Sequence, residues 1–279
     1  MKKINIFCFG FGQVAKNFIK KINTEKFSIN LSVTTREQSK VKQFNEIKYN
    51  NFIFNDEIFD NGLIENLKNS DHILISIPPI NGKDIVIKYF GEVIKECNPK
   101  WITYLSATSV YGDHKGEWVN EESETNPKST SGIGRLEAEK SWITFTANSK
   151  LPFQIFRLSG IYSNQKNILV RLKSGNVNLI NKKNQFFSRI HVEDIANVLF
   201  KSLSNFKTGE IYNISDDKPA SMEEVTLYGV KLLNVDIPKI IEVKDIDSEM
   251  LKSFYKDSKK VSNKKMKSFF DYQLKFPTY

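Results

Sequence analysis

The sequence predicts an α/β fold, a doubly wound parallel sheet with a small C-terminal lobe. Three observations lead to this prediction. An apolar strand over residues 4–9 runs into the turn pattern Gly10-x-Gly12-x-x-Ala15 and then into a helical segment. Strand and helix patterns alternate through the first 160 residues or so, which is typical of a parallel sheet with helices on both faces. Residues 71–77 form a nearly continuous apolar run before Pro78-Pro79, as expected for a central strand buried on both faces.

The individual elements follow from apolar runs of strand or helix length that are bounded by glycine, proline or polar residues. In the first part of the chain we predict strands over 4–9, 29–34, 51–55, 71–77, 101–105 and 153–158. We predict helices after Ala15, over 85–97, and over 132–145 behind a Ser/Thr-rich loop that supplies caps. Beyond Gly160 we predict helices over 168–173, 191–203 and 222–233, strands over 177–180 and 210–214, and one or two lysine-rich helices ending at Pro277.

The first turn has the pattern of a dinucleotide-binding strand-turn-helix, which indicates a Rossmann sheet. Gly10 would permit the tight turn, Gly12 would let the backbone approach a pyrophosphate, and the small Ala15 would let the helix pack close to the strand. The helix N-terminus would then hold the phosphate charge. The alternative is a tight turn with nothing bound.

Other cofactor contacts are expected at the carboxyl ends of the strands, where open parallel sheets bind ligands. The residues expected to bind the cofactor are Gly10, Phe11, Gly12, Gln13, Val14, Thr34, Thr35, Arg36, Ser76, Pro78, Ser106 and Arg135. We predict an NAD(P)-binding domain over 1–162, to which 187–214 returns, and a mainly substrate-side lobe over 163–279.

The end of the second strand favours NADP over NAD. An NAD-preferring site has an acidic residue there for the adenosine ribose, but this strand ends in Thr34-Thr35-Arg36 with no acid before Glu37. The hydroxyls and the guanidinium suit an anionic 2'-phosphate. The alternative is an exposed Arg36 that touches nothing.

Composition argues against several classes of protein. The 279 residues are 40% hydrophobic and 12% aromatic, which is ample for a buried core. We find no signal-peptide pattern and no apolar run of membrane-spanning length, so we expect a cytoplasmic protein with no membrane partner. Cys8 and Cys97 are the only cysteines, so we predict neither a disulfide framework nor a metal site.

The formal charge of +9 raises the question of nucleic acid. Only five of the 41 basic residues are arginines, and the lysines are scattered among asparagines. Arginine-rich patches interleaved with aromatic residues would be the better indication. We therefore predict a small-molecule substrate and no nucleic-acid partner, in a monomer or a homodimer.

Four further segments carry a family resemblance: Leu105-Ser-Ala-Thr-Ser-Val-Tyr-Gly112, Arg157-Leu-Ser-Gly-Ile-Tyr162, Arg189-Ile-His-Val-Glu-Asp-Ile-Ala196 and Ile211-Tyr-Asn-Ile-Ser-Asp-Asp217. With the glycine turn, they resemble the extended short-chain dehydrogenase/reductases of the NAD-dependent epimerase/dehydratase superfamily over essentially the whole chain. Ser258-Lys-Lys-Val-Ser-Asn263 and the Gly-x-Gly-x-x-Ala variant look most like the atypical YeeZ-like members.

The resemblance implies hydride transfer assisted by a helix-borne Tyr-x-x-x-Lys, in which the tyrosine is the general acid/base. Here Ser131 stands at the tyrosine position, Arg135 at the lysine position, and Ala107 at the position of the usual assisting Ser/Thr. An alcohol cannot exchange a proton near neutral pH without a further base, whereas Arg135 can still supply charge and hydrogen bonds to the cofactor.

Three other residues are candidates for contact with the substrate. Tyr111 is the best substitute phenol because it follows the fifth strand, and the alternative is a hydrogen-bonded tyrosine in a turn. His191 could donate to a substrate or bind backbone at a helix start, and Thr108 lies close to Tyr111 in the chain. Tyr255-x-x-x-Lys259 matches the catalytic spacing but is interpreted as a coincidence.

Two hypotheses remain open. The first is an NADP-dependent oxidoreductase or epimerase-like enzyme that acts on a small substrate, such as a nucleotide-linked sugar or a carbonyl compound, with Tyr111, Ser131 and Arg135 as candidate catalytic residues. The second is a catalytically silent NADP-binding sensor or partner-binding module. The replaced Ser131 and Arg135 favour the second, and the intact motifs around Arg157, His191 and Asn213 favour the first.

Overall fold

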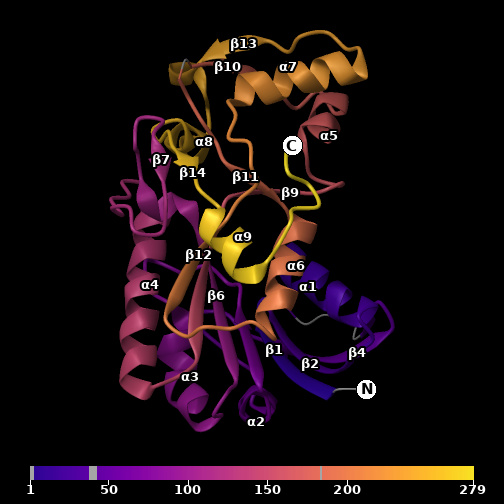
Figure 1. The fold of residues 1–279 in the computed structure, drawn as a ribbon, viewed down its shortest axis with the longest axis vertical. Helices are drawn as coiled ribbons and strands as arrows, with labels where there is room; N and C mark the ends of the chain where they lie inside the picture. Colours follow the sequence, from indigo (N-terminus) through magenta and orange to yellow (C-terminus); the bar gives the residue numbers. More distant parts are fainter. Residues whose placement is uncertain (1–2, 38–42, 183) are drawn as a thin grey trace. The chain divides into compact units, whose positions relative to one another are not determined.

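The computed structural model describes residues 3–37, 43–182 and 184–279 (Figure 1). The chain forms two compact units. Unit 1 comprises Met1–Ala107, Ile133–Arg157 and Ile195–Tyr212, and unit 2 comprises Thr108–Gly132, Leu158–Asp194 and Asn213–Tyr279. This division does not test the predicted domain boundaries at residue 162 and around residues 187–214, which stay predictions.

Unit 1 contains most of the long strands and helices. Those wholly inside it are β1 (Lys3–Phe9), α1 (Gln13–Thr24), β2 (Ser28–Thr35), β3 (Gln43–Phe44), β4 (Ile47–Ile53), α2 (Gly62–Lys68), β5 (His72–Ile75), α3 (Ile85–Glu96) and β6 (Trp101–Ala107). It also contains most of α4 (Thr130–Ser149), β8 (Phe153–Leu158), α6 (Val192–Ser202) and β12 (Glu210–Ile214), of which one to three end residues belong to unit 2. Unit 2 contains η1 (Thr108–Tyr111), β7 (Trp118–Val119), β9 (Gly160–Tyr162), α5 (Ile168–Lys173), β10 (Leu179–Asn181), β11 (Arg189–His191), α7 (Met222–Leu233), β13 (Ile240–Glu242), η2 (Val243–Asp245), α8 (Glu249–Phe254), β14 (Lys260–Val261) and α9 (Lys264–Phe270).

The central sheet has eight strands in the order β12-β8-β6-β5-β1-β2-β4-β3. The strand β1 pairs in parallel with β2 and β5, β5 pairs in parallel with β6, and β2 with β4, whereas β3 is antiparallel to β4. The predicted α/β fold with a mostly parallel sheet is confirmed.

Helices cover both faces of the sheet because each strand alternates two sets of apolar side chains. On one face, Phe9 and Ile73 pack in a core with α2, α3 and α4, where Phe90 and Trp142 are fully buried. On the other face, Phe18 of α1 stacks on Trp101 at a centroid distance of 5.9 Å. The same indole donates to Ser202 of α6 at 3.0 Å. This arrangement explains the nearly continuous apolar runs of the central strands.

Several boundaries differ from the sequence prediction. His191 was expected to begin a helix, but it ends the short strand β11, and α6 begins at Val192. β4 covers Ile47–Ile53 rather than 51–55. The last helix ends at Phe270 and not at Pro277, because Asp271 adopts a left-handed conformation (φ +44°) and its N–H caps the helix by donating to the Lys267 and Ser268 carbonyls.

The short strands β9 and β11 form a parallel pair in unit 2 that no sequence pattern predicted. Three residues cannot show a periodicity, so only the pairing defines them. The segment after α9 is held beside this pair by Asp194, which accepts hydrogen bonds from the Tyr272 hydroxyl and the Lys275 and Phe276 N–H groups at 2.5–3.0 Å. In the part of the chain that the structure describes, no helix combines the length and apolarity needed to cross a bilayer.

Candidate functional site

The turn between β1 and α1 accepts only glycine at its first position. Gly10 has a φ of +89°, and a Cβ there would lie 2.8 Å from Ile77 Cγ2 and 2.8 Å from Ser76 Oγ. The Gly10 N–H donates to Thr34 Oγ1 at 2.8 Å, and Ser76 Oγ donates to the Phe9 and Gly10 carbonyls at 3.0 and 3.1 Å. Two of the residues expected to contact a cofactor, Thr34 and Ser76, therefore hold the turn itself.

The second glycine leaves an open position at the start of α1. A Cβ on Gly12 would meet no atom within 4 Å, and no side chain caps the helix. The first turn of α1 carries no acidic residue, so its N–H groups and its positive end are available to an anion. Val14 and Ala15 pack into the core, so they can offer a ligand only their backbone. These features fit a dinucleotide pyrophosphate.

The end of β2 is followed by an exposed cation, Arg36. Thr35 Oγ1 donates to the Glu37 carbonyl at 2.5 Å and lies 3.2 Å from Asn51 Oδ1. Arg36 is exposed and, among the residues that the structure describes, makes no hydrogen bond or ion pair. The guanidinium is thus available to a phosphate, whereas the Thr35 hydroxyl proton is already used.

Near the end of β6, Arg135 contacts the phenol of Tyr104. Arg135 Nη1 donates to the Leu105 carbonyl at 2.7 Å and to the Tyr104 hydroxyl at 3.2 Å. Burial raises the pKa of Tyr104 well above its ordinary value, and the nearby guanidinium only partly offsets this effect. Tyr104 therefore stays protonated near neutral pH. This pair could not be predicted from the sequence, because Tyr104 lies inside an apolar strand.

Ser106, next to that pair, has a buried hydroxyl with no hydrogen-bond partner among the described residues. A buried hydroxyl without a partner is costly, so a bound ligand that reaches it would gain a hydrogen bond. It is one of the expected cofactor contacts. Like the open space beside Gly12 and the uncapped N-terminus of α1, the orphaned hydroxyl fits a bound nicotinamide dinucleotide.

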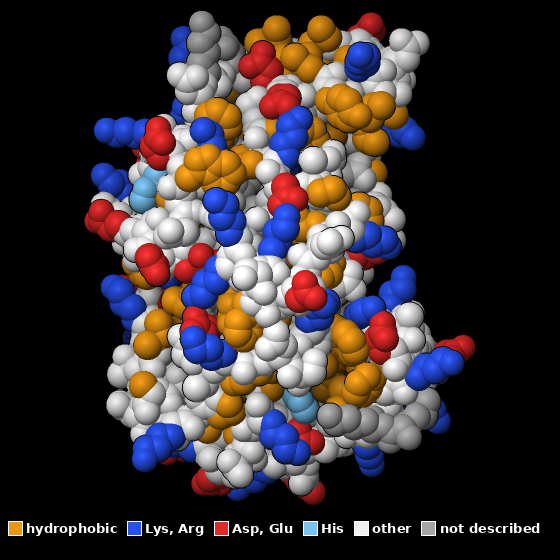
Figure 2. All heavy atoms as spheres, in the orientation of Figure 1, with side chains coloured by type: hydrophobic (Ala, Val, Ile, Leu, Met, Phe, Trp, Pro, Cys, Tyr) orange, Lys and Arg blue, Asp and Glu red, His pale blue; other side chains and the backbone are white. Residues whose placement is uncertain are grey.

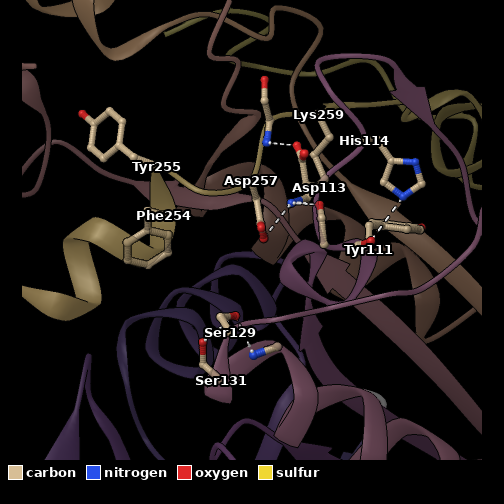
Figure 3. A network of polar contacts seen from close by, with 12 residues as sticks. Tyr111, Asp113, His114, Ser129, Ser131, Phe254, Tyr255, Asp257 and Lys259 are labelled. Carbon is tan, nitrogen blue, oxygen red and sulfur yellow. Dashed lines mark hydrogen bonds and ion pairs between the residues drawn. The ribbon is translucent and has the colours of Figure 1, made fainter. Parts of the chain in front are cut away.

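Ser131, which stands at the position of the missing tyrosine, lies in unit 2 in the first turn of α4. Its hydroxyl is 3.5 Å from the Ser129 hydroxyl (Figure 3), and no basic side chain in the described part of the chain hydrogen-bonds to it. Ser129 also accepts from the Gly132 N–H at 3.1 Å. The serine can therefore orient a substrate oxygen, but it has no base that would take its proton.

Tyr111 is fully buried, and its hydroxyl donates to Asn213 Oδ1 at 2.7 Å. Its carbonyl oxygen lies 3.2 Å from His114 Nε2, the contact drawn in Figure 3. The hydroxyl thus has a buried protein partner, which favours the structural alternative for this residue.

A large cavity of about 1110 Å³ lies within unit 2. Its volume is at the upper end of the range for small-molecule sites. Thr108 and His191, two of the three residues expected to contact a substrate, line it together with Ser131, a candidate catalytic residue, and Tyr111 does not. The cavity therefore brings together two of the predicted substrate contacts and one predicted catalytic residue.

His191 is buried between aromatic rings, with its centroid 3.7 Å from Phe276 and 5.1 Å from Tyr162. Its Nδ1 accepts from the Glu193 N–H at 3.3 Å, so Nε2 carries the proton of the neutral ring. Nε2 has no partner among the described residues. Burial lowers the pKa of His191, so the ring is a neutral donor near neutral pH.

Tyr255 and Lys259, interpreted from the sequence as a coincidence of spacing, both line the cavity (Figure 3). Lys259 donates to the Gly112 carbonyl at 2.8 Å and lies 3.6 Å from an Asp257 carboxylate oxygen. Burial lowers the pKa of Lys259. Only the folded structure shows that Lys259 contacts Gly112, because the two residues are 147 positions apart in the chain.

The cysteines show no sign of redox or metal chemistry. Cys8 is buried, and Cys97 donates to the Leu67 and Val93 carbonyls at 3.2 and 3.0 Å. Burial raises the pKa of Cys97 to about 11, which keeps it a thiol. Within the described ranges, no three His, Cys, Asp or Glu side chains form a group that could hold a metal ion.

Comparison with known proteins adds a family and a set of relatives. Residues 89–215 match the sequence model of the NAD dependent epimerase/dehydratase family. A solved structure described as a functionally unknown conserved protein from Silicibacter pomeroyi DSS is 31% identical, with a TM-score of 0.87 and coverage of 98% of this chain and 94% of that one. No curated protein sequence matches the chain.

Two more distant structures share the fold and contain NAD. The dTDP-glucose 4,6-dehydratase of Bacillus anthracis str. Ames, in complex with NAD, is 18% identical at a TM-score of 0.78, with 98% and 92% of the two chains covered. The UDP-glucuronic acid 4-epimerase of Bacillus cereus, in complex with NAD, is 14% identical at a TM-score of 0.77, with 98% and 94% covered.

Proposed function

Because the chain belongs to the NAD-dependent epimerase/dehydratase family, we propose that it is an NADP-binding member that acts on a small substrate without the usual Tyr-x-x-x-Lys pair. The observation that carries this proposal is the glycine turn. The open position beside Gly12, the uncapped N-terminus of α1 and the orphaned Ser106 hydroxyl support a bound dinucleotide.

The preference for NADP is supported by Arg36. Its exposed guanidinium has no partner among the described residues, and the strand before it offers no carboxylate to a ribose. The dehydratase and the epimerase described above bind NAD, so the preference proposed here rests on this chain's own residues.

The bound nicotinamide would supply hydride transfer, and the protein's residues would bind and orient the reactants. Arg135 would place a fixed positive charge and free N–H donors at the carboxyl end of β6. Ser131 and Thr108, on the cavity wall, would hold a substrate oxygen by hydrogen bonds. Because the Tyr111 hydroxyl is hydrogen-bonded to Asn213, we propose a structural role for Tyr111 and no role in proton transfer.

The substrates most compatible with the family are a nucleotide-linked sugar or a small carbonyl compound. A dTDP-glucose dehydratase and a UDP-glucuronic acid epimerase are among the proteins of the same fold. A second function, a silent NADP-binding sensor, is favoured by one observation: among the described side chains, no base hydrogen-bonds to Ser131.

Nicotinamide fluorescence separates these hypotheses. The full chain is titrated with NADPH and then mixed with a panel of carbonyl compounds and nucleotide sugars. Saturable binding with turnover of a panel member supports the enzyme, and saturable binding without any turnover supports the silent module. If the protein bound neither NADPH nor NADH, both the enzyme hypothesis and the silent-module hypothesis would be excluded.

A further inference from the structure

Arg189 is a half-buried cation in the cavity wall, with its guanidinium carbon 5.6 Å from the centre of the Tyr279 ring. Its Nη1 donates to the Phe187 and Ala220 carbonyls at 3.0 Å each, and its Nη2 lies 3.1 Å from Met222 Sδ. Among the residues that the structure describes, Arg189 forms no ion pair. Partial burial lowers the pKa of Arg189. A half-buried cation without a paired carboxylate is well placed to receive an anion from a ligand.

The acidic group that acts most strongly on Arg189 compensates its charge only in part. That group is Asp216, whose pKa burial raises to about 7. Near neutral pH this carboxyl is only partly ionised. Glu224, the other carboxyl group that acts on Arg189, already pairs with Lys218 at 3.0 Å. Of the acids on the cavity wall, Asp257 lies 3.6 Å from Lys259, and Asp245 and Asp247 are exposed to solvent.

The same face of the β9–β11 pair carries a second free donor. Arg189 and His191 are two residues apart on β11, so both side chains point to one side of the strand. His191 pairs with Tyr162 of β9, and both residues line the cavity with Arg189. The protonated Nε2 of His191, a residue only 2% exposed, has no partner among the described residues.

Much of the rest of the cavity wall is apolar, beside a polar part that includes Asn164, Lys166, Asn167, Asn176 and Asn178. Aliphatic and aromatic side chains from α5, α7, β13 and α8 make up the apolar part: Leu169, Val225, Leu232, Ile241, Leu251 and Phe254. Three wall residues on α7 and α8 are also open to solvent, with Tyr228 51%, Leu232 56% and Phe254 51% exposed. Figure 2 shows hydrophobic side chains at the surface around α7. An apolar ligand could therefore enter along an apolar rim.

We propose that this cavity binds an amphipathic anion, with its anionic head at Arg189 and its apolar body along the wall formed by α5, α7, β13 and α8. The inference rests on the proposed function in that the cavity is taken as its substrate site, and for that site it favours an amphipathic anion over the nucleotide-linked sugar that the relatives suggest. Over this apolar part of the wall, the many hydroxyl and amide groups of a nucleotide sugar would lose water without finding partners. A carboxylate or phosphate on an aliphatic body leaves one polar group to satisfy, and Arg189 can do so with paired donors.

Calorimetric titration of the full chain tests this with ligands of matched shape. Decanoate and decyl phosphate are compared with decan-1-ol, which has the same body without the charge, and with UDP-glucose, which has the charge without the apolar body. We expect saturable binding of at least one of the two decyl anions, at least about tenfold tighter than decan-1-ol. Equal affinity for decan-1-ol, or tighter binding of UDP-glucose than of either anion, would overturn the proposal.

Variants locate the head group. Arg189→Gln should weaken binding of the anion about tenfold or more and leave decan-1-ol unchanged, whereas Arg171→Gln, at an exposed arginine on the same wall, should cost less than about threefold. Equal losses in the two variants would overturn the assignment. If Arg189→Gln unfolds, Arg189→Lys keeps the charge, and the wild-type ligand series still decides. NADPH titration of the same protein shows separately whether the proposed function has failed.

Discussion

Replacing Gly10 and Gly12 by alanine, one at a time, separates the folding of the first turn from binding at it. At Gly10 the left-handed φ of +89° costs a side chain about 1–2 kcal/mol. The contacts of 2.8 Å with Ser76 and Ile77 add about 1–3 kcal/mol of overpacking. Gly10→Ala should therefore lose about 2–5 kcal/mol of unfolding free energy, measured by urea denaturation without cofactor.

Gly12→Ala should behave in the opposite way. No atom lies within 4 Å of the added methyl group, so the loss of unfolding free energy should stay below about 1 kcal/mol, the scale of a changed helix cap. A pyrophosphate seated there would meet that methyl group, and an overpacking cost of about 1–3 kcal/mol corresponds to a roughly 5- to 150-fold higher Kd for NADPH. Wild-type NADPH affinity in a folded Gly12→Ala protein would refute the placement of the cofactor.

Three further changes test the surrounding chemistry. Glu139→Ala leaves Arg157 buried without its carboxylate partner at 2.7 Å and should lower the unfolding free energy in urea by about 3–5 kcal/mol; a loss under about 1 kcal/mol would contradict this. The raised pKa of Asp216, about 7, means that the folded state holds a proton which the unfolded state releases near pH 4. Wild-type stability should therefore fall by up to about 4 kcal/mol between about pH 4 and 7, and Asp216→Asn should flatten that fall. Tyr111→Phe removes the hydrogen bond to Asn213 and should cost about 1 kcal/mol of stability while kcat, with any substrate found, stays within about twofold; a roughly 10²–10⁴-fold loss would restore Tyr111 as general acid.

The fold was predictable where the chain's pattern is local. Continuous apolar runs identified the central strands because those strands are buried on both faces, and β12 and α7 were predicted at the bounds that the structure has. The paired three-residue strands β9 and β11 were not predictable, since each is a strand only through a partner 29 residues away in the register His191 with Tyr162.

The candidate site was predictable in part, for the same reason. The spacing of Gly10 and Gly12 follows from one turn, so the sequence contains the whole motif. The cavity could not be predicted in this way, because its wall joins Ser131, Arg189 and Lys259 from distant segments of unit 2. Whether Arg189 has a carboxylate partner is also a property of packing, which no spacing can express.

The most direct test of the account is the affinity of the wild-type protein for NADPH and NADH, measured side by side by nicotinamide fluorescence. A charge-assisted pair between Arg36 and a 2'-phosphate predicts that NADPH binds at least about tenfold tighter, and that Arg36→Ala loses this preference while it keeps its affinity for NADH. Equal wild-type affinity for the two cofactors would contradict the NADP site, and binding of neither would contradict the dinucleotide turn at Gly10.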